Sequence, residues 1–326
     1  MTRELQITEW LNNILKNQEY TIKPASSDAS FRRYFRIVSN NKSYILMDAP
    51  PEKENSKPFI EVANVLLKAG LNVPKIYEAD LKKGFLLLSD LGSRTYLDEL
   101  NHENASLLYR DAYLALIKIQ KSADTQMLNL YDESLLMQEL RLFPDWYLKS
   151  HKSYEMNDSE KNVLGSTFDL LIKNIKSHAR VFVHRDFHSR NLMLCYGDQD
   201  QNPGILDFQD AVKGSIVYDL VSLFKDAYIV WNEEEIMDWL IRYWQQAKQN
   251  KLNVQDDFAE FYRDFEWMGV QRHLKVLGIF ARLNYRDHKA NYLNNLPAVE
   301  NYLRRACERY KDLQPLLKLI NKLGLT

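Results

Sequence analysis

One polar segment in the middle of the chain limits the possible folds more than any other feature. Residues 184–191 read HRDFHSRN, and short apolar segments precede and follow them at residues 181–183 and 192–194. Short apolar runs bounded by polar residues are typical of strands. A polar loop held between two strands keeps its side chains in fixed positions, so we expect this loop to carry chemistry.

The spacing of the polar residues indicates which chemistry to expect. The loop contains Asp186 within HRD and Asn191 five residues later, and Asp207 follows within DFQ, sixteen residues after Asn191. Protein kinases have the same HRD-to-Asn spacing and then DFG, so Gln209 stands in place of the glycine. Mg²⁺ prefers oxygen ligands, which Asn191 and Asp207 could supply, while Asp186 could accept the proton of an attacking hydroxyl. The alternative is a polar turn in which these side chains only cap the backbone.

The composition argues against several classes of function. Of the 326 residues, 45% are hydrophobic and 27% charged, and the formal net charge is −1. A chain without a basic excess is not expected to bind nucleic acid or anionic lipid through its overall charge. Two cysteines without a CxxC pair, no signal-peptide pattern and no apolar run of ~20 residues predict a cytoplasmic protein with neither a nucleic-acid nor a membrane partner.

The hydrophobic pattern predicts two domains, residues 1–91 and residues 92–326. The first begins with an amphipathic helix and continues as an antiparallel meander, one helix and a further strand, whereas the second is mostly helical. The predicted strands are residues 20–23, 31–38, 43–47 and 84–88, and the predicted helices are residues 57–69, 107–120, 166–175 and 216–231. Aromatic residues at helical spacing in the last of these helices predict a packing face.

Blocks of sequence along most of the chain resemble one known family. These blocks are residues 28–36, 47–51, 84–92, 184–193, 207–211, 218–223 and 271–280. They are similar to the aminoglycoside phosphotransferase (choline-kinase-like) group of protein-kinase-like small-molecule kinases. The resemblance implies an α+β fold with two lobes, in which a small N-terminal lobe is built on an antiparallel sheet and a larger C-terminal lobe is mostly helical.

The resemblance also implies ATP and Mg²⁺ as cofactors and assigns roles by position. Asp186 would be the catalytic carboxylate, and Asn191 and Asp207 the magnesium ligands. His184 and Asp219 would be structural, with Asp219 accepting hydrogen bonds from the backbone of the catalytic loop. The loop over the ATP phosphates and the segment between the lobes would supply nucleotide-binding residues, namely Ser27, Asp28, Ser30, Ser89, Asp90 and Leu91.

Two features depart from the family pattern. The expected phosphate loop, residues 26–30, contains no glycine, and Met47 stands where kinases commonly have a lysine for the α- and β-phosphates. Small side chains in that loop still permit backbone amides to approach a phosphate. As further nucleotide-binding candidates, Arg32 or Arg33 could replace the missing positive charge, or both could lie on a solvated strand face. The departures leave a second class of function open, a pseudokinase that binds nucleotide without turnover.

Local charge favours a neutral or anionic acceptor. His188, Arg190, Arg272 and His273 place positive charge in the matched blocks, whereas a pocket for choline or an aminoglycoside calls for acidic or aromatic residues. Within the family, the chain resembles bacterial kinases that phosphorylate amino sugars during cell-wall recycling. The resemblance implies transfer of the γ-phosphate of ATP to the anomeric hydroxyl of N-acetylmuramate or N-acetylglucosamine.

The expected protein is thus a monomer whose partners are ATP and an amino sugar. The candidate acceptor-binding residues are Asp186, Arg190, Asp210 and Arg272. Arg272 could bind the carboxylate of N-acetylmuramate, or it could form an ion pair on a helix. Asp210 could bind sugar hydroxyls, or it could fix the hairpin that follows Asp207. Another small alcohol or an aminoglycoside is the alternative acceptor.

Overall fold

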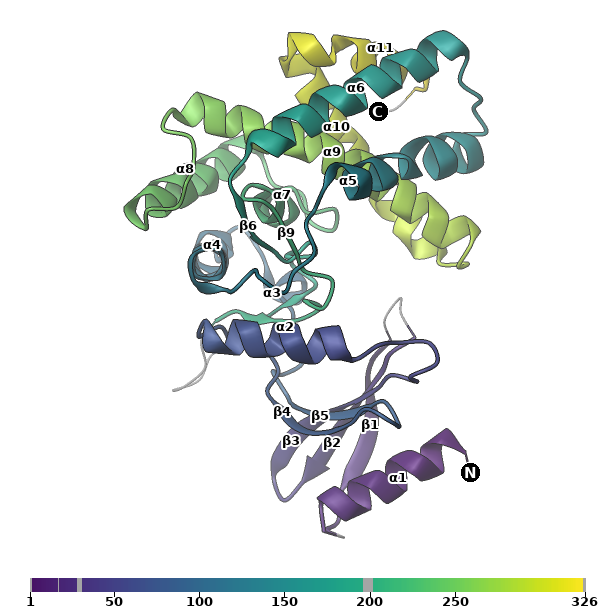
Figure 1. Cartoon of the computed structure of the whole chain (residues 1–326), viewed down its shortest axis with the longest axis vertical. Coiled ribbons are helices and arrows are strands. Elements are labelled where there is room, and N and C mark those ends of the chain that lie inside the picture. The colour runs from purple at the N-terminus through teal and green to yellow at the C-terminus, as the bar shows by residue number, and fades with distance from the viewer. Residues whose placement is uncertain (1, 17, 28–30, 196–201, 325–326) are drawn as a thin grey trace. The chain divides into compact units, whose positions relative to one another are not determined.

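The computed structural model describes residues 2–16, 18–27, 31–195 and 202–324. These residues form two compact units (Figure 1). The first unit comprises Met1–Glu99 and Asn191–Asp210, and the second comprises Leu100–Arg190 and Ala211–Thr326. The segment that carries Asn191 and Asp207 therefore belongs to the same unit as the N-terminal sheet. The predicted division into residues 1–91 and 92–326 stays a proposal.

The first unit is built on a five-stranded antiparallel sheet in the order β1-β2-β3-β5-β4. Its described elements are α1 (Arg3–Ile14), β1 (Thr21–Ser27), β2 (Arg33–Ser39), β3 (Lys42–Asp48), α2 (Lys57–Lys68), β4 (Ile76–Asp80), β5 (Phe85–Ser89), α3 (Tyr96–Glu99), β7 (Leu192–Met193) and β8 (Gly204–Ile205). The predicted meander is confirmed. The hydrophobic pattern did not predict β4, because this edge strand is mostly exposed and lacks apolar alternation.

Two asparagines form the tight turn of the β2–β3 hairpin. Ser39 pairs with Lys42, so Asn40 and Asn41 make a two-residue loop, with φ angles of 49° and 59°. Positive φ at both central positions matches the twist of paired strands, and asparagine tolerates it better than most residues. The short loop fixes the register of the two strands.

Helix α1 covers one face of the sheet. Trp10 of α1 lies with its ring centroid 5.4 Å from that of Phe85, and Leu11 is fully buried. The buried cluster that they belong to consists of Ile7, Trp10, Leu11, Leu15, Ile37, Leu46, Phe85 and Leu87. Because successive side chains of a strand point to opposite faces, Met47, next to Leu46, points away from α1.

A buried carboxylate joins α1 to the sheet. Asp48, the last residue of β3, has no exposed surface and accepts hydrogen bonds from Arg3 Nε at 2.8 Å and Arg33 Nε at 2.9 Å. Burying a charge is tolerated only where it is paired and hydrogen-bonded. The two arginines meet that condition, and Arg3 thereby fixes α1 against the end of β3.

The β7–β8 hairpin is bound to other segments of the first unit on both of its strands. Asn72 forms a parallel bridge with Gly204, and Thr95 forms an antiparallel bridge with Met193. After the hairpin, Phe208 packs on Phe59 of α2, with ring centroids 4.9 Å apart. These contacts hold residues 191–195 and 202–208 in fixed positions within the unit.

The second unit is mostly helical. Its described elements are α4 (Ala105–Ser122), α5 (Glu133–Leu140), the π-helix η1 (Phe143–His151), α6 (Asp158–Ser177), β6 (Arg180–Val183), β9 (Val212–Ser215), α7 (Tyr218–Phe224), α8 (Glu233–Gln249), α9 (Phe258–Tyr285), the 3₁₀ helix η2 (Ala290–Asn295), α10 (Leu296–Arg309), the 3₁₀ helix η3 (Lys311–Leu313) and α11 (Gln314–Lys322). The predicted helical character of this part is confirmed.

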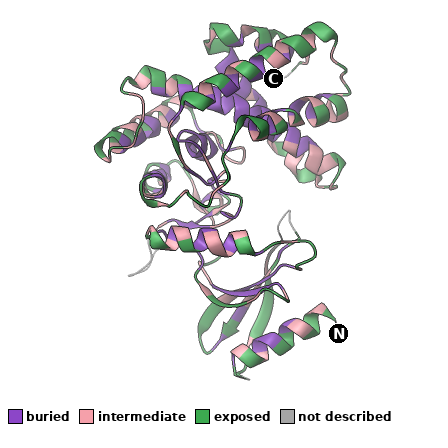
Figure 2. Ribbon diagram, viewed as in Figure 1, coloured by how far each residue is buried: buried purple, intermediate pink, exposed green. Residues whose placement is uncertain are grey.

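Helix α9 forms the centre of the second unit. It is buried continuously from Asp264 to Gly278 (Figure 2), as expected for a helix surrounded by other elements. At Gly278, a Cβ atom would lie 2.3 Å from the carbonyl carbon of Leu142. Glycine therefore lets α9 approach the backbone just before η1.

The predicted helix over residues 216–231 is wrong in its second half. Helix α7 ends at Phe224, and Lys225 has φ −115° and ψ 50°, outside the helical region. The carboxylate of Asp226 accepts a hydrogen bond from the backbone N–H of Tyr228 at 3.0 Å. Such a local side-chain bond gives the backbone an alternative to the helix, and the hydrophobic pattern does not reveal it.

Among the described residues, no helix combines the length and the apolar character needed to cross a membrane.

Candidate active site

The polar segment of residues 184–191 forms a loop after β6. Strand β6 pairs antiparallel with β9, with Val183 opposite Val212, and β9 leads into α7. Asp219 of α7 accepts hydrogen bonds from the backbone N–H of His184 at 2.7 Å and of Arg185 at 3.0 Å. The pairing of β6 with β9 thus brings the acceptor Asp219 to the start of the loop.

Asp219 is itself held in an unfavourable environment for a charge. Its side chain is buried, with 1% exposure. Burial raises the pKa of this carboxyl to about 7, although the two backbone N–H groups act in the opposite direction. The carboxyl group therefore forms hydrogen bonds with the loop backbone and has almost no contact with solvent.

The loop backbone adopts a strained conformation immediately before Asp186. Arg185 has a φ angle of 77°, which is uncommon for a residue other than glycine. Its N–H donates to Asp219, and its carbonyl oxygen accepts from Ser222 Oγ at 3.3 Å. Strained conformations persist only where the surroundings fix them, and they cluster at functional sites.

Asp186 itself lies in a positive environment. Its side chain is 43% exposed, and His188 Nε2 lies 4.0 Å from its Oδ1. Partial burial would raise the pKa of Asp186, but the charges of Lys275, His188 and Arg272 outweigh this effect and lower the pKa to about 2. The carboxyl therefore remains ionised at neutral pH, as an acceptor for a substrate proton must be.

His184 contributes to the start of the loop. It is 1% exposed, and its Nδ1 accepts a hydrogen bond from the backbone N–H of Asp186 at 3.3 Å. Its ring lies edge-on to that of Phe187, with centroids 5.7 Å apart. The predicted structural residues His184 and Asp219 thus both contact the loop backbone.

The second half of the loop is held by the turn after α7. Asp226 accepts hydrogen bonds from the backbone N–H and the hydroxyl of Ser189, at 3.0 and 2.5 Å. The guanidinium carbon of Arg190 lies 3.7 Å above the ring centroid of Tyr228, and His188 is edge-on to the same ring. Tyr228, predicted only as part of a packing face, therefore supports two side chains of the loop.

Arg272 lies in the buried stretch of α9. It is 7% exposed, and its guanidinium carbon lies 5.5 Å from the ring centroid of Tyr218. Its charge acts on Asp186, because it contributes to the lowered pKa of that carboxyl. The structure thus brings Asp186, Arg190 and Arg272, predicted as acceptor-binding residues, into one unit.

Asn191 and Asp207, the predicted magnesium ligands, lie together in the first unit. Asn191 Nδ2 is 3.3 Å from Asp207 Oδ2, and Gln209 Nε2 donates to Asp207 Oδ1 at 2.7 Å. Asp207 has a φ angle of 62°, which places its side chain by an uncommon backbone conformation. Asp210 is exposed, and one of its carboxylate oxygens lies 3.5 Å from Gln209 Nε2.

This pair of side chains suits Mg²⁺. The ion takes oxygen ligands, keeps several waters, and is commonly held by one or two protein groups together with substrate phosphates. Asp207 and Asn191 carry such oxygens and lie side by side, although the 3.3 Å contact between them joins Asp207 Oδ2 to the amide nitrogen of Asn191, whose Oδ1 would be the ligand. Among the described residues, no group of three or more His, Cys, Asp or Glu side chains is arranged to hold a metal ion.

The segment predicted to bind adenine begins with Ser89, the last residue of β5. Ser89 N donates to the Lys75 carbonyl at 2.8 Å, so its backbone is already paired. Asp90 accepts hydrogen bonds from Arg36 Nε at 2.6 Å and from the hydroxyl of Ser43 at 2.5 Å. The carbonyl oxygen of Leu91 lies 3.4 Å from the sulfur of Cys195.

The predicted phosphate loop is only partly described. Asp28 and Ser30 lie outside the described residues, and the backbone of Ser27 pairs with Arg33 at the end of the sheet. Arg32 forms an ion pair with Glu54 at 3.1 Å. Arg33 binds Asp48 and lies 3.6 Å from Glu4 of α1, so its guanidinium is on the face of the sheet that α1 covers.

Sequence reasoning missed three charged residues that contact the loop or act on Asp186. They are Asp226, which binds Ser189, Glu139, which binds Arg185, and Lys275, whose charge lowers the pKa of Asp186. Glu139 and Lys275 are 5% and 4% exposed. For Glu139 and Lys275, the sequence shows a charged residue within an apolar helical segment. That pattern does not indicate whether the charged side chain is exposed to solvent or buried beside a functional loop.

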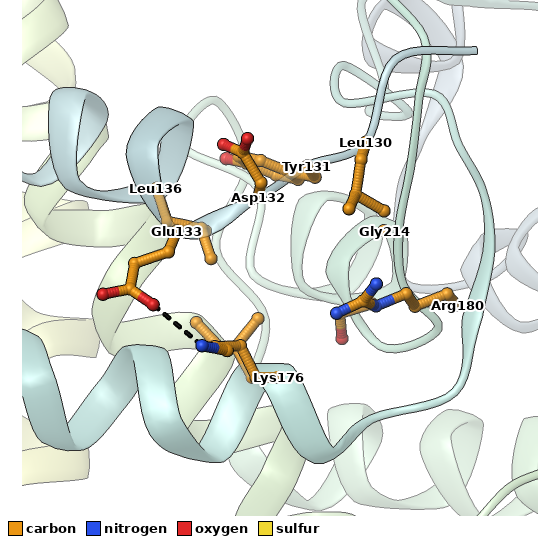
Figure 3. Close-up of a pocket in the computed structure, with 10 residues that line it drawn as sticks. Leu130, Tyr131, Asp132, Glu133, Leu136, Lys176, Arg180 and Gly214 are labelled. Carbon is orange, nitrogen blue, oxygen red and sulfur yellow. Dashed lines mark hydrogen bonds and ion pairs between the residues drawn. The ribbon is translucent and has the colours of Figure 1, made fainter.

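A pocket in the second unit is lined by a different set of residues (Figure 3). Glu133 and Lys176 form an ion pair at 2.8 Å beside it, and the labelled side chain of Arg180 lies across from them. The described lining consists of Leu130, Tyr131, Asp132, Glu133, Leu136, Ile175, Lys176, Arg180, Gly214 and Ser215. None of the predicted site residues is among them.

Comparison with known proteins gives the same class of chemistry. Residues 21–259 match the phosphotransferase enzyme family. A protein of Pseudomonas aeruginosa named N-acetylmuramate/N-acetylglucosamine kinase is 47% identical over 300 residues, which cover 92% of this chain and 88% of that protein. A protein of Neisseria meningitidis with the same name is 42% identical over 328 residues, which cover 99% of this chain and 96% of that protein.

Solved structures confirm the predicted fold class. A choline kinase from Streptococcus pneumoniae superposes with a TM-score of 0.66 at 15% identity, over 93% of this chain and 99% of that one. The same choline kinase in complex with AMP gives a TM-score of 0.61 at 15% identity, over 92% and 98% of the two chains. At this identity the likeness concerns the fold, a kinase-like α+β arrangement of an antiparallel sheet followed by a helical part.

Proposed function

The chain belongs to the phosphotransferase enzyme family, and from that premise we propose that it is a sugar kinase which transfers the γ-phosphate of ATP to N-acetylmuramate or N-acetylglucosamine. The product would be the sugar 1-phosphate, formed at the anomeric hydroxyl in peptidoglycan recycling. The names of relatives that are 42–47% identical over nearly the whole chain carry the choice of substrate. The loop that presents Asp186 carries the choice of reaction.

In the proposed mechanism, Asp186 orients the sugar hydroxyl and accepts its proton while the oxygen attacks the γ-phosphorus of ATP, and the bond from the γ-phosphorus to the bridging oxygen breaks so that ADP leaves. The lowered pKa of Asp186, about 2, keeps the carboxylate ready to form this hydrogen bond. Asp219 and Asp226 hold the loop backbone on either side of it. Catalysis would rest on positioning and charge stabilisation, without a covalent intermediate.

Asn191 and Asp207 would hold Mg²⁺, which neutralises negative charge on the ATP phosphates. Gln209 would orient Asp207 through the hydrogen bond to Oδ1. A ligand that is itself hydrogen-bonded keeps a fixed direction. The Gln209 side chain therefore has a role that the glycine of DFG cannot have.

Nucleotide binding is proposed at the segment of Ser89, Asp90 and Leu91 and at the loop that includes Ser27, Asp28 and Ser30. Because the N–H of Ser89 already donates to the Lys75 carbonyl, the adenine contacts would come from the backbone of Asp90 and Leu91. Arg36 and Ser43 would fix the Asp90 side chain, which leaves the neighbouring backbone as the adenine contact. Of the two arginines, Arg32 is the stronger phosphate candidate, because Arg33 lies on the face covered by α1. The complex of the structural neighbour with AMP supports a nucleotide site in this fold.

The acceptor contacts are proposed for Arg190, Arg272 and Asp210. The guanidinium of Arg190 is exposed and supported by the ring of Tyr228, so it could bind the carboxylate of N-acetylmuramate in a bidentate manner. Arg272 is more buried and would act mainly through its charge. Asp210 would bind sugar hydroxyls. We propose a cytoplasmic monomer that acts on small molecules only.

Phosphorus NMR of the purified protein with ATP, Mg²⁺ and each amino sugar tests the proposal. An anomeric sugar phosphate that forms with the unmodified protein and not with Asp186→Asn would support the reaction, the substrate and the catalytic residue together. Intact ATP beside both sugars would contradict the substrate. Other alcohols and aminoglycosides would then be tried, and binding of ATP without turnover of any of them would favour the pseudokinase alternative.

A further inference from the structure

Glu139 is a buried carboxylate with four hydrogen-bond donors around it. It lies in the last turn of α5 and is 5% exposed. Oε1 accepts from Arg185 Nη2 and, at 2.9 Å, from Lys275 Nζ, while Oε2 accepts from the Tyr131 hydroxyl and, at 3.4 Å, from Gln271 Nε2. Lys275 and Arg185 outweigh the effect of burial and hold the pKa of Glu139 below its usual value. The carboxylate is therefore ionised and fully engaged.

Arg185 is the donor that connects Glu139 to the catalytic loop. This residue precedes Asp186 directly and has the positive φ angle of 77°. Asp219 binds its N–H and Ser222 binds its carbonyl oxygen, so Glu139 completes the set by holding the side chain. A non-glycine residue keeps such a conformation only where its surroundings over-determine it.

Lys275 is the second cation on Glu139. It is 4% exposed on α9, and its ammonium group also donates to the Tyr218 hydroxyl at 2.9 Å. Breaking a buried ion pair on one side leaves an uncompensated charge. Without Glu139, the partly buried Arg185 and the buried Lys275 would face each other with no anion between them, and their repulsion would displace Arg185.

We infer that Glu139 is a positioning residue: by binding Arg185 and Lys275 together, it fixes the strained Arg185 turn and thereby the direction of the Asp186 carboxylate. Helices α5 and α9 would thus control the geometry of a loop to which neither belongs. The consequence for turnover rests on the proposed role of Asp186, whereas the consequence for the loop backbone does not.

The test compares Glu139→Gln with Glu300→Gln as a matched control. Glu300 is also a buried carboxylate, 6% exposed, that binds a tyrosine hydroxyl, from Tyr147, and lies 3.8 Å from a lysine ammonium, Lys152. It contacts no described residue of the loop in any of these interactions. The measurements are melting temperature, kcat and KM for ATP and the sugar, ATP affinity, and hydrogen exchange of the amides of residues 184–186.

Both variants are expected to lower the melting temperature, but only Glu139→Gln should change the loop. In that variant kcat should fall about 100-fold, as for a misplaced catalytic group, while ATP affinity stays within about threefold. The amides of residues 184–186 should exchange about tenfold faster through local opening. Glu300→Gln should leave kcat and the exchange of the amides of residues 184–186 unchanged. A kcat of Glu139→Gln within about threefold of the unmodified protein would overturn the inference.

The double variant Glu139→Gln/Lys275→Met separates positioning from stability. Removing both charges relieves the unpaired cation, so the melting temperature should rise above that of Glu139→Gln. Because the charge of Lys275 also acts on Asp186, hydrogen exchange and not kcat decides here. Arg185 still lacks its carboxylate, so the amides of residues 184–186 should still exchange about tenfold faster than in the unmodified protein. Recovery of slow exchange together with the melting temperature would mean that Glu139 is only structural. This variant also carries the test if Glu139→Gln alone does not fold.

The failure of the inference is distinguishable from the failure of the proposed function. If the unmodified protein phosphorylates neither sugar, the proposed substrate is wrong, but hydrogen exchange still decides whether Glu139 holds the loop. If the sugars are phosphorylated and the exchange of residues 184–186 is the same in Glu139→Gln as in the unmodified protein, the substrate stands and the positioning role is wrong.

Discussion

At the scale of single residues, Asp186 and Asp219 are two carboxyl groups of opposite character. Positive side chains lower the pKa of Asp186 to about 2, whereas burial raises the pKa of Asp219 to about 7. Groups whose environments push their pKa values apart are typical of functional sites. The half-exposed Asp186 is suited to meet a substrate, and the buried Asp219 to hold the backbone.

Replacing Asp186 with Asn should remove the proton acceptor and spare nucleotide binding. We expect kcat to fall by about 10²–10⁴-fold, the usual contribution of a general base, with ATP affinity nearly unchanged. Steady-state kinetics together with calorimetric titration of ATP would measure both quantities. Loss of ATP binding, or loss of folding, in the Asn variant would contradict the catalytic assignment.

Asp219 predicts a pH dependence of stability. Its folded-state pKa, about 7, is above its unfolded value of 3.8, so its contribution to stability is fully present below pH 3.8 and is lost as the pH rises through about 7. The unmodified protein should therefore lose more unfolding free energy between about pH 5 and pH 8 than Asp219→Asn does. Urea unfolding of both proteins at the two pH values measures this difference. Equal losses would show that Asp219 does not titrate in this range.

At the scale of elements, the buried helix α9 depends on a close approach to the backbone before η1. Gly278→Ala would place a Cβ atom 2.3 Å from the carbonyl carbon of Leu142. Because backbone atoms cannot give way cheaply, we expect a loss of about 1–3 kcal/mol of unfolding free energy. Chemical denaturation would measure it.

Gly165→Ala in α6 is the matched control for Gly278→Ala. A Cβ atom at Gly165 meets no atom within 4 Å, and alanine favours a helix interior over glycine by about 0.8–1 kcal/mol. This variant should therefore be more stable than the unmodified protein. If both alanine variants changed the unfolding free energy in the same direction, close packing at Gly278 would not be the cause.

At the scale of the whole molecule, each of the two units contains some of the residues to which a role is proposed. Asn191 and Asp207 belong to the first unit, and Asp186 and Arg272 to the second. A ligand that binds only the folded protein stabilises it by mass action, by about 2.7 kcal/mol at a free concentration 100 times Kd. Binding of nucleotide and metal can therefore be followed through unfolding, independently of any acceptor.

A non-hydrolysable ATP analogue with Mg²⁺ should raise the melting temperature more than the analogue with EDTA does. In Asp207→Asn the part of the increase that depends on Mg²⁺ should disappear, because a neutral amide replaces the charged ligand. Differential scanning fluorimetry would measure the shift. An undiminished Mg²⁺-dependent increase in this variant would contradict the assignment of Asp207.

The sequence by itself determined the parts of the fold and site that depend on local pattern. Alternating and helical periodicity predicted the meander, helices α1, α2, α4 and α6, and the first half of a helix at α7. The spacing of Asp186, Asn191 and Asp207 predicted phosphoryl transfer. These signals are local because a strand, a helix or a loop motif is written in consecutive residues. The exposed edge strand β4 and the end of α7 at Phe224 were not predicted, since neither is marked by apolar periodicity.

Only the tertiary structure decided which distant side chains serve the loop. Glu139 and Lys275 are 136 residues apart in sequence and meet at 2.9 Å, and Asp226 reaches Ser189 across 37 residues. The structure also placed the guanidinium of Arg33 on the face of the sheet that α1 covers. Burial and pairing of charges depend on which elements pack together, and a charged residue in the sequence does not indicate whether folding will leave it in water or bring it to a buried partner.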